Sequence, residues 1–200
     1  MMIDKTGETD IKANAPVPDA GRLDRIAIDH RYLYRTTQRL FDFIASAVAL
    51  IVLSPVFLIV AVLIKCDDPQ GPVFYSQIRL GKHQRPFKMY KFRSMVVDAD
   101  QKLNELLKYN EVDGAMFKMK HDPRVTRVGR FIRKYSIDEL PQLFNVLQGR
   151  MALVGPRPPL KRELEKYTAY DKQRLYVKPG CTGLWQVPAV IMWGLKTWLN

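Results

Sequence analysis

Apolar and polar positions divide the chain into a polar start, one long apolar stretch and an amphipathic remainder. Residues 1–34 are mostly polar and contain no apolar run of the kind found in signal peptides. We interpret them as a polar flexible leader. Arg31–Arg39 then forms a short basic and aromatic approach, a composition typical of the headgroup level of a membrane.

The apolar stretch predicts a membrane-embedded segment over residues 35–65. Ile44–Ile64 carries no charged residue over 21 positions, which is long enough to span a bilayer. Ser54 and Pro55 lie at its middle, and proline removes a backbone donor and clashes with the carbonyl four residues earlier. The residues leave two arrangements open, a kinked spanning helix or a re-entrant hairpin that enters and leaves on one face. Flanking charges do not decide, since Arg39 precedes the stretch and Lys65 follows it.

Residues 66–187 mix short strands with amphipathic helices, which predicts an α+β domain that is mainly helical. Strands are expected at Gly71–Gln77 and Pro86–Arg93, on either side of a turn at Gly81. Apolar residues at helical spacing predict helices over residues 98–109, 125–134, 137–147 and 160–175.

The excess of positive over negative charge lies entirely within residues 65–200. The net charge is +12, yet residues 1–64 hold seven Lys/Arg and seven Asp/Glu. A basic domain beside a membrane should face anionic lipid or anionic substrates, with nucleic acid as the competing partner. Cys66 and Cys181 lack CxxC spacing, so neither a disulfide framework nor a zinc site is expected.

Two adjacent carboxylates, Asp138 and Glu139, begin one of the predicted helices. In a purely structural interpretation they belong to a capping box, with Ser136 as N-cap and Glu139 as the third helical residue. In a functional interpretation, nearby Arg133 and Arg157 complete an anion site at a helix N-terminus. Such a site would bind a diphosphate, lower the pKa of Asp138 and keep it ionised as a nucleophile. Both interpretations can hold together.

The loop at residues 155–158 presents one arginine between two prolines. Pro156 and Pro158 restrict the backbone on both sides of Arg157, so its guanidinium is held on a stiff loop. The alternative is a plain turn with a solvated arginine.

Further cations recur at regular spacing. Lys91 and Arg93 should share one face of the second predicted strand, with Phe92 on the other, although an ordinary amphipathic edge strand would look the same. Arginines at every third position form either a phosphate-tracking stripe or a solvated helical face: Arg124, Arg127, Arg130 and Arg133.

Six motifs, taken in order, resemble those of the bacterial sugar transferases, the monotopic phosphoglycosyl transferases. They are Ser54-Pro55, Pro72–Gln77, Lys91–Met95, Ser136–Val146, Leu153–Pro158 and Lys178–Val187. The resemblance covers roughly residues 35–187.

Members of that family transfer a sugar 1-phosphate from a UDP-sugar to undecaprenyl phosphate, with release of UMP, as the first membrane step of exopolysaccharide, capsule or other surface glycan synthesis. The resemblance implies that Asp138 is the nucleophile, through a covalent phosphosugar intermediate, and that Glu139 helps to hold Mg²⁺. Lys91 and Arg133 would contact phosphate, and Arg157 the nucleotide. The full set of expected substrate-binding residues is Lys91, Arg93, Arg133, Pro156, Arg157 and Pro158.

The resemblance also implies a location and partners. The break at Ser54 and Pro55 would form a re-entrant hairpin with both ends cytoplasmic, on the cytoplasmic face of the bacterial cell membrane. The implied partners are a UDP-sugar, undecaprenyl phosphate, membrane lipid and downstream glycosyltransferases, but not nucleic acid.

The chain departs from the family pattern after Val187. Codons compatible with residues 189–200, read in the neighbouring frame, can spell a family-like continuation. We therefore hypothesise that residues 188–200 are an atypical, out-of-frame tail, which the gene's DNA would test. Two alternatives to an active transferase follow: a truncated inactive transferase, and a membrane-tethered basic module that binds anionic lipid or nucleic acid.

Overall fold

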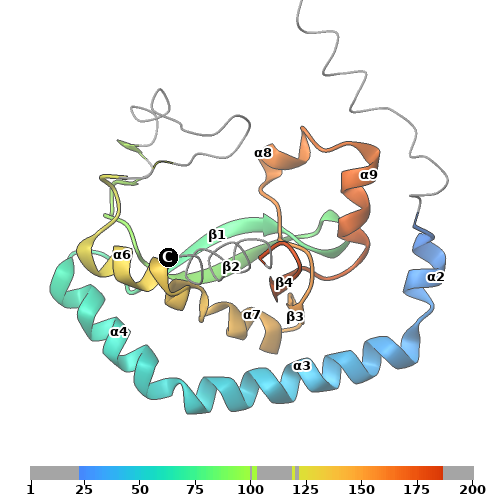
Figure 1. Ribbon diagram of the computed structural model, residues 1–200, viewed down its shortest axis with the longest axis horizontal. Coiled ribbons are helices and arrows are strands. Elements are labelled where there is room, and N and C mark those ends of the chain that lie inside the picture. The colour runs from blue at the N-terminus through green and yellow to red at the C-terminus, as the bar shows by residue number, and fades with distance from the viewer. Residues whose placement is uncertain (1–22, 100, 103–118, 120–121, 187–200) are drawn as a thin grey trace, which may run out of the picture.

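The computed structural model describes residues 23–99, 101–102, 119 and 122–186 (Figure 1). Residues 1–22 of the expected leader, most of the helix expected over 98–109, and the tail at 188–200 lie outside the described residues. The described end of the leader is helical: α2 (Arg25–Asp29) begins where the Asp24 carboxylate accepts the backbone N–H groups of Ile26 and Ala27.

A long bent pair of helices runs along one side of the molecule (Figure 1). They are α3 (Tyr32–Val52) and α4 (Ser54–Asp67), and the helix axis bends by 59° between them. Pro55 lies in the first turn of α4, and the Ser54 hydroxyl donates to the Ile51 carbonyl at 2.7 Å. The predicted helix break at Ser54 and Pro55 is therefore confirmed. Among the described residues no helix is by itself long and apolar enough to cross a bilayer, whereas the bent pair passes that test when its two halves are taken together.

The outer faces of α3 and α4 are apolar and uncovered. Six of their large hydrophobic side chains are 53–73% exposed: Leu40, Phe41, Ile44, Ile51, Leu58 and Ile59. The inner face of α4 packs instead against the rest of the fold, where Val60 and Ile64 join Phe92 and Ile132 in one buried cluster. Hydrophobic burial thus anchors α4 to the domain and leaves an apolar surface on its other side.

An antiparallel hairpin forms the centre of the domain. Strand β1 (Phe74–Leu80) pairs with β2 (Pro86–Phe92), with Leu80 opposite Pro86, which confirms the two predicted strands. The fully buried Asn145 of α7 (Gln142–Leu147) fixes β2 from the other side. Its amide oxygen accepts the Tyr90 N–H at 2.9 Å, and its NH₂ donates to the Lys88 carbonyl at 2.7 Å.

A small parallel pair, β3 (Ala152–Val154) and β4 (Gly180–Thr182), completes the sheet structure. Gly180 is required there, because a Cβ would lie 2.1 Å from the Gly155 backbone nitrogen. Helix α3 contacts α7 through Arg39, which donates to the carbonyls of Val146 and Leu147 at 2.6 and 2.7 Å, and it contacts β3 through Asp42, which accepts the Leu153 N–H at 3.2 Å.

Two predicted helices are shorter than expected, although the fold is mixed α and β with more helix than strand, as predicted. The helix expected over 137–147 is split into the 3-10 helix η4 (Ile137–Glu139) and α7, because Pro141 supplies no N–H. The helix expected over 160–175 is divided where Thr168 and Asp171 cap a new start. Its pieces are α8 (Lys161–Leu164), α9 (Ala169–Lys172) and η5 (Gln173–Tyr176).

Candidate active site

A cavity of about 660 Å³ gathers residues from the hairpin, from α6 (Arg127–Lys134), from η4 and from the segment that leads into α8. Seven cations line it: Arg79, Lys91, Arg93, Arg124, Arg133, Arg157 and Arg162. Three carboxylates line it as well: Asp138, Glu139 and Glu163. Of the catalytic and substrate-binding residues predicted from the sequence, the described lining includes Lys91, Arg93, Arg133, Asp138, Glu139 and Arg157, but not Pro156 or Pro158.

Asp138 and Glu139 enter the cavity from a tight turn. Ser136 has φ 57°, in the left-handed region, and its side chain caps no helix. The expected capping box is therefore wrong, because an N-cap residue needs extended backbone. The turn follows directly on the end of α6. It is closed by the Glu139 N–H, which donates to the Ser136 carbonyl at 3.2 Å.

Lys91 lies between the two carboxylates. Its ammonium nitrogen is 2.6 Å from Oε1 of Glu139 and 3.9 Å from Oδ2 of Asp138. Asp138 is only 8% exposed, and this burial raises its pKa above the ordinary value. The Glu139 charge also raises that pKa, while Lys91 and Arg133 lower it without reversing the shift. The expected lowering of the Asp138 pKa is therefore wrong, because desolvation outweighs cations of which the nearest is closer to Glu139.

Arg133 and Arg93 also line the cavity, but they differ in whether a carboxylate already neutralises their charge. Arg133, in the last turn of α6, is exposed and lines the cavity. Arg93 follows directly after β2, is 7% exposed, and has its Nη1 at 3.2 Å from the Asp68 carboxylate. Gly71 makes room for it, since a Cβ there would meet that nitrogen at 1.5 Å. Arg93 thus borders the cavity mainly as one half of a buried ion pair.

The expected arginine stripe is not continuous. Helix α6 begins only at Arg127, after Thr126 caps it by accepting the Gly129 N–H at 2.9 Å. Arg124 precedes the helix, is buried, and pairs with Asp122 at 2.6 Å. The exposed members lie on α6: Arg127, Arg130 and Arg133.

The Pro-Arg-Pro loop presents Arg157 to the cavity. Both prolines hold the loop through their carbonyls: that of Pro156 accepts the Gly180 N–H at 3.0 Å, and that of Pro158 accepts from Arg79 at 3.1 Å. The Arg157 guanidinium lies 3.8 Å from Oε1 of Glu163. The prolines therefore act here as a frame, and the arginine supplies the charge.

Sequence reasoning missed Arg79 and Glu163. Glu163 is 6% exposed; one oxygen accepts the Leu160 N–H at 2.9 Å and lies 4.0 Å from Arg79, while the other faces Arg157. Strand alternation could have found Arg79, because Tyr75 shares its face of β1 and pairs with Lys91. No local signal marks Glu163, which reaches the site only through the turn of the chain into α8.

The carboxylates of the cavity suit one type of metal ion. In the described parts of the chain no three His, Cys, Asp or Glu side chains converge as a ready metal cage. Mg²⁺ at phosphate sites is usually held by one or two carboxylates together with the substrate's own phosphates. Asp138 and Glu139 match that donor set.

The chemistry of the cavity is that of a phosphate site. Its cations exceed its carboxylates by seven to three, which favours a multiply charged anion. Asp138, one of its buried carboxylates, is more basic than usual. The model of the family described as bacterial sugar transferase matches residues 33–193, which include every residue of this cavity.

The chain belongs to this family. The galactosyl transferase CpsE of Streptococcus agalactiae is 47% identical over 79% of the chain, and the undecaprenyl-phosphate galactose phosphotransferase of Salmonella typhimurium is 49% identical over 76%. The exopolysaccharide production protein ExoY of Rhizobium meliloti is 45% identical over 75% of the chain. The matched part of the chain spans about a third of the first two relatives, 35% and 33%, and 68% of ExoY.

Proposed function

We propose that this sugar transferase moves a sugar 1-phosphate from a UDP-sugar to undecaprenyl phosphate and releases UMP, at the start of exopolysaccharide or capsule synthesis. The observation that carries the proposal is the buried Asp138 carboxylate beside Lys91 and Glu139, in a cavity whose cations outnumber its carboxylates. The lipid acceptor is supported by relatives named as undecaprenyl-phosphate galactose and glucose phosphotransferases. These names differ in the sugar, so they do not indicate which sugar this chain transfers.

Substrate binding would rest on Arg133, which is exposed, and on Arg157, whose guanidinium lies 3.8 Å from the Glu163 carboxylate. Arg133 and Arg157 lie on separate elements, so they can hold different phosphates of one diphosphate. Lys91 already pairs with Glu139, and an incoming phosphate would share that ammonium. Arg93 and Arg124 are tied to Asp68 and Asp122 and would shape the cavity more than bind substrate.

The first chemical step would be attack by a carboxylate oxygen of Asp138 on the phosphorus next to the sugar. A new Asp–O–P bond forms as the bridging P–O bond of the diphosphate breaks, and UMP leaves with that electron pair. Burial supports this role, because a poorly solvated carboxylate is more basic than one in water.

The second step would return Asp138 to its starting form. A phosphate oxygen of undecaprenyl phosphate attacks the same phosphorus, the aspartyl O–P bond breaks, and the carboxylate is regenerated. Glu139 would help to hold Mg²⁺, which when bound neutralises the diphosphate and eases the departure of UMP. Two steps on one nucleophile predict ping-pong kinetics.

We also propose that α3 and α4 form a re-entrant hairpin at the cytoplasmic face of the bacterial cell membrane. The 59° bend and the exposed apolar faces of both helices support this arrangement. Labelling from one side with an impermeant maleimide tests it. Cys66 at the end of α4 is exposed, whereas burial raises the pKa of Cys181 to about 12 and keeps that thiol unreactive.

If α3 and α4 form a re-entrant hairpin, Cys66 and a cysteine introduced by Leu23→Cys should both react in inverted vesicles and both be protected in intact cells. A spanning helix would instead expose one of them on each side.

The activity itself is tested by UMP release in lipid nanodiscs that contain undecaprenyl phosphate and Mg²⁺. UDP-galactose, UDP-glucose and UDP-N-acetylgalactosamine are offered separately. We expect release with at least one of them, and a loss of at least about 10³-fold in Asp138→Asn. Glu165→Gln, which neutralises an exposed carboxylate outside the cavity, is the matched control and should keep full activity. Release that survives Asp138→Asn would contradict the proposed nucleophile, and no release with any donor would favour a truncated inactive transferase.

A further inference from the structure

A second cavity, of about 600 Å³, lies at the corner between α2 and α3 and shares no lining residue with the first. Residues from the start of α3, from the hairpin turn and from the segment before β4 line it. Five of them are cations: Arg31, Arg35, Arg39, Lys82 and Lys178. The one carboxylate among its described lining residues is Asp42.

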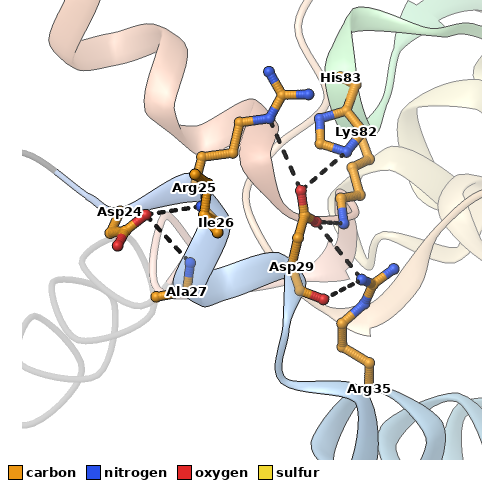
Figure 2. Close-up of polar contacts among 8 residues, drawn as sticks. All are labelled: Asp24, Arg25, Ile26, Ala27, Asp29, Arg35, Lys82 and His83. Carbon is orange, nitrogen blue, oxygen red and sulfur yellow. Dashed lines mark hydrogen bonds and ion pairs between the residues drawn. The ribbon is translucent and has the colours of Figure 1, made fainter.

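Asp29 holds two of these cations at the rim. Figure 2 shows its carboxylate facing Lys82, Arg35, Arg25 and His83. Lys82 lies at 2.5 Å and Arg35 at 3.6 Å, while Arg25 and His83 are more distant at 3.9 and 3.8 Å. One carboxylate therefore faces three permanent cations and a histidine. This cluster orders Lys82 and Arg35 but leaves the corner with an excess of positive charge.

Lys178 faces that excess from the other wall. In the part of the chain that the structure describes, neither a hydrogen bond nor an ion pair engages its half-buried ammonium. Its pKa is lowered, first by burial and then by Arg39, Arg35 and Lys82, with Asp42 as the opposing charge. Asp42 itself is 5% exposed and accepts the Leu153 N–H at 3.2 Å. An anion in the cavity would relieve this repulsion.

The cavity opens at the level where lipid headgroups are expected. Tyr32 and Tyr34 line it and are 66% and 62% exposed, as in the aromatic belts of membrane interfaces. The exposed apolar face of α3 is established by Phe41, six residues after Arg35 or about 9 Å along the helix. That distance is comparable with the headgroup layer of one leaflet, about 5–8 Å.

We propose that this second cavity binds the phosphate of an anionic membrane phospholipid, whose acyl chains lie along the apolar face of α3. The inference rests on the proposed membrane association of α3 and α4. Free phosphate offers the same charge, but it lacks the acyl chains that the neighbouring apolar surface would receive. Asp42, the carboxylate among the described lining residues, accepts the Leu153 N–H, so we assign this cavity a role in binding and not in transfer.

Native mass spectrometry of the full chain released from nanodiscs tests the proposal. The nanodiscs contain phosphatidylcholine with a minor fraction of phosphatidylglycerol, and neither UDP-sugar nor undecaprenyl phosphate. We expect the chain to retain phosphatidylglycerol, and Lys178→Gln to weaken that retention about fivefold, the effect of one interfacial charge. Arg31→Gln, at an exposed position of the same cavity, is the second variant should Lys178→Gln fail to fold. The control Lys166→Gln removes an exposed charge outside both cavities and should change nothing.

Equal retention by Lys178→Gln, Arg31→Gln and Lys166→Gln would overturn the proposal. A further arm compares protection of the Lys178 amine from acylation by inorganic phosphate and by phosphatidylglycerol nanodiscs. Protection by lipid alone is expected, whereas equal protection by phosphate would overturn the lipid assignment. Because no substrate is present, failure here leaves the proposed transfer reaction untouched. A chain that does not enter nanodiscs would overturn this inference and the membrane association together.

Discussion

The two cavities are similar in size and both are rich in cations, but they differ in their carboxylates. The first holds Asp138, Glu139 and Glu163 among its cations, whereas in the second the described lining includes Asp42 alone, which a backbone N–H of β3 engages. Fixed cations are sufficient to bind a phosphate. Transfer of a phosphoryl group through the protein needs in addition a nucleophile that can reach phosphorus. The comparison assigns transfer to the first cavity and binding to the second.

The difference arises from how each cavity is built. Around the first, a left-handed turn at Ser136 projects two neighbouring carboxylates toward a strand that carries Lys91. Around the second, the cations come from a helix start and from two loops, and Asp29 at the rim takes up Lys82 and Arg35. Besides the loss of activity expected for Asp138→Asn, three predictions test this contrast.

Of these three, the largest effect is expected for Lys91→Met. This substitution removes the ammonium that lies between Asp138 and Glu139 and leaves the two carboxylates to repel each other. We expect kcat/KM for UMP release to fall about 10²-fold, the usual loss when one fixed electrostatic donor is removed. Lys88→Met, three residues away at an exposed position of β2, is the control. Similar losses in both variants would mean that strand stability, and not the position of the charge, was measured.

A smaller effect is expected for Arg157→Lys, which keeps the charge but loses the planar fork that binds phosphate. Since Glu163 at 3.8 Å orients this guanidinium at the cavity wall, KM for the UDP-sugar should rise about tenfold while kcat changes little. Arg174→Lys, outside the first cavity, should leave both constants unchanged. A fall in kcat without a change in KM would contradict a binding role.

The smallest effect concerns stability. Because the pKa of Asp138 is raised on folding, its protonated form stabilises the fold at low pH, and this contribution is lost as pH rises through the folded pKa. At neutral pH, Asp138→Asn should therefore have a higher melting temperature than the natural chain. The difference is on the order of 2–4 °C for each kcal/mol gained in the free energy of unfolding. The gap should close toward about pH 4, the ordinary pKa of an aspartate.

Thermal melts across that pH range, with Glu165→Gln as control, measure the gap. A lower melting temperature for Asp138→Asn at neutral pH would show that attraction to Lys91 outweighs burial.

The sequence was sufficient for features encoded by neighbouring residues or by motif. The helix break follows from Ser54 and Pro55, and the hairpin from two runs around Gly81. The motifs also predicted that Lys91, Asp138 and Arg157 belong to one site, and all three line the cavity although they lie far apart in the chain.

Features that depend on distant packing could not be predicted. The burial that raises the pKa of Asp138 requires the assembled cavity, and the pairing of Arg93 with Asp68 requires α4 to end beside β2. Glu163 carries no local signal, and the motif that begins at Lys178 does not indicate the cations around that residue, because each acquires its surroundings only when separate segments meet.

Intact-protein mass spectrometry tests the central claim, that Asp138 carries the phosphosugar, most directly. The chain in nanodiscs is incubated with Mg²⁺ and single UDP-sugars, without undecaprenyl phosphate. We predict a mass increase equal to one sugar phosphate for at least one donor, its absence in Asp138→Asn, and its loss when undecaprenyl phosphate is added. An adduct that persists in Asp138→Asn, or UMP release that needs the lipid acceptor and passes through no adduct, would contradict the account.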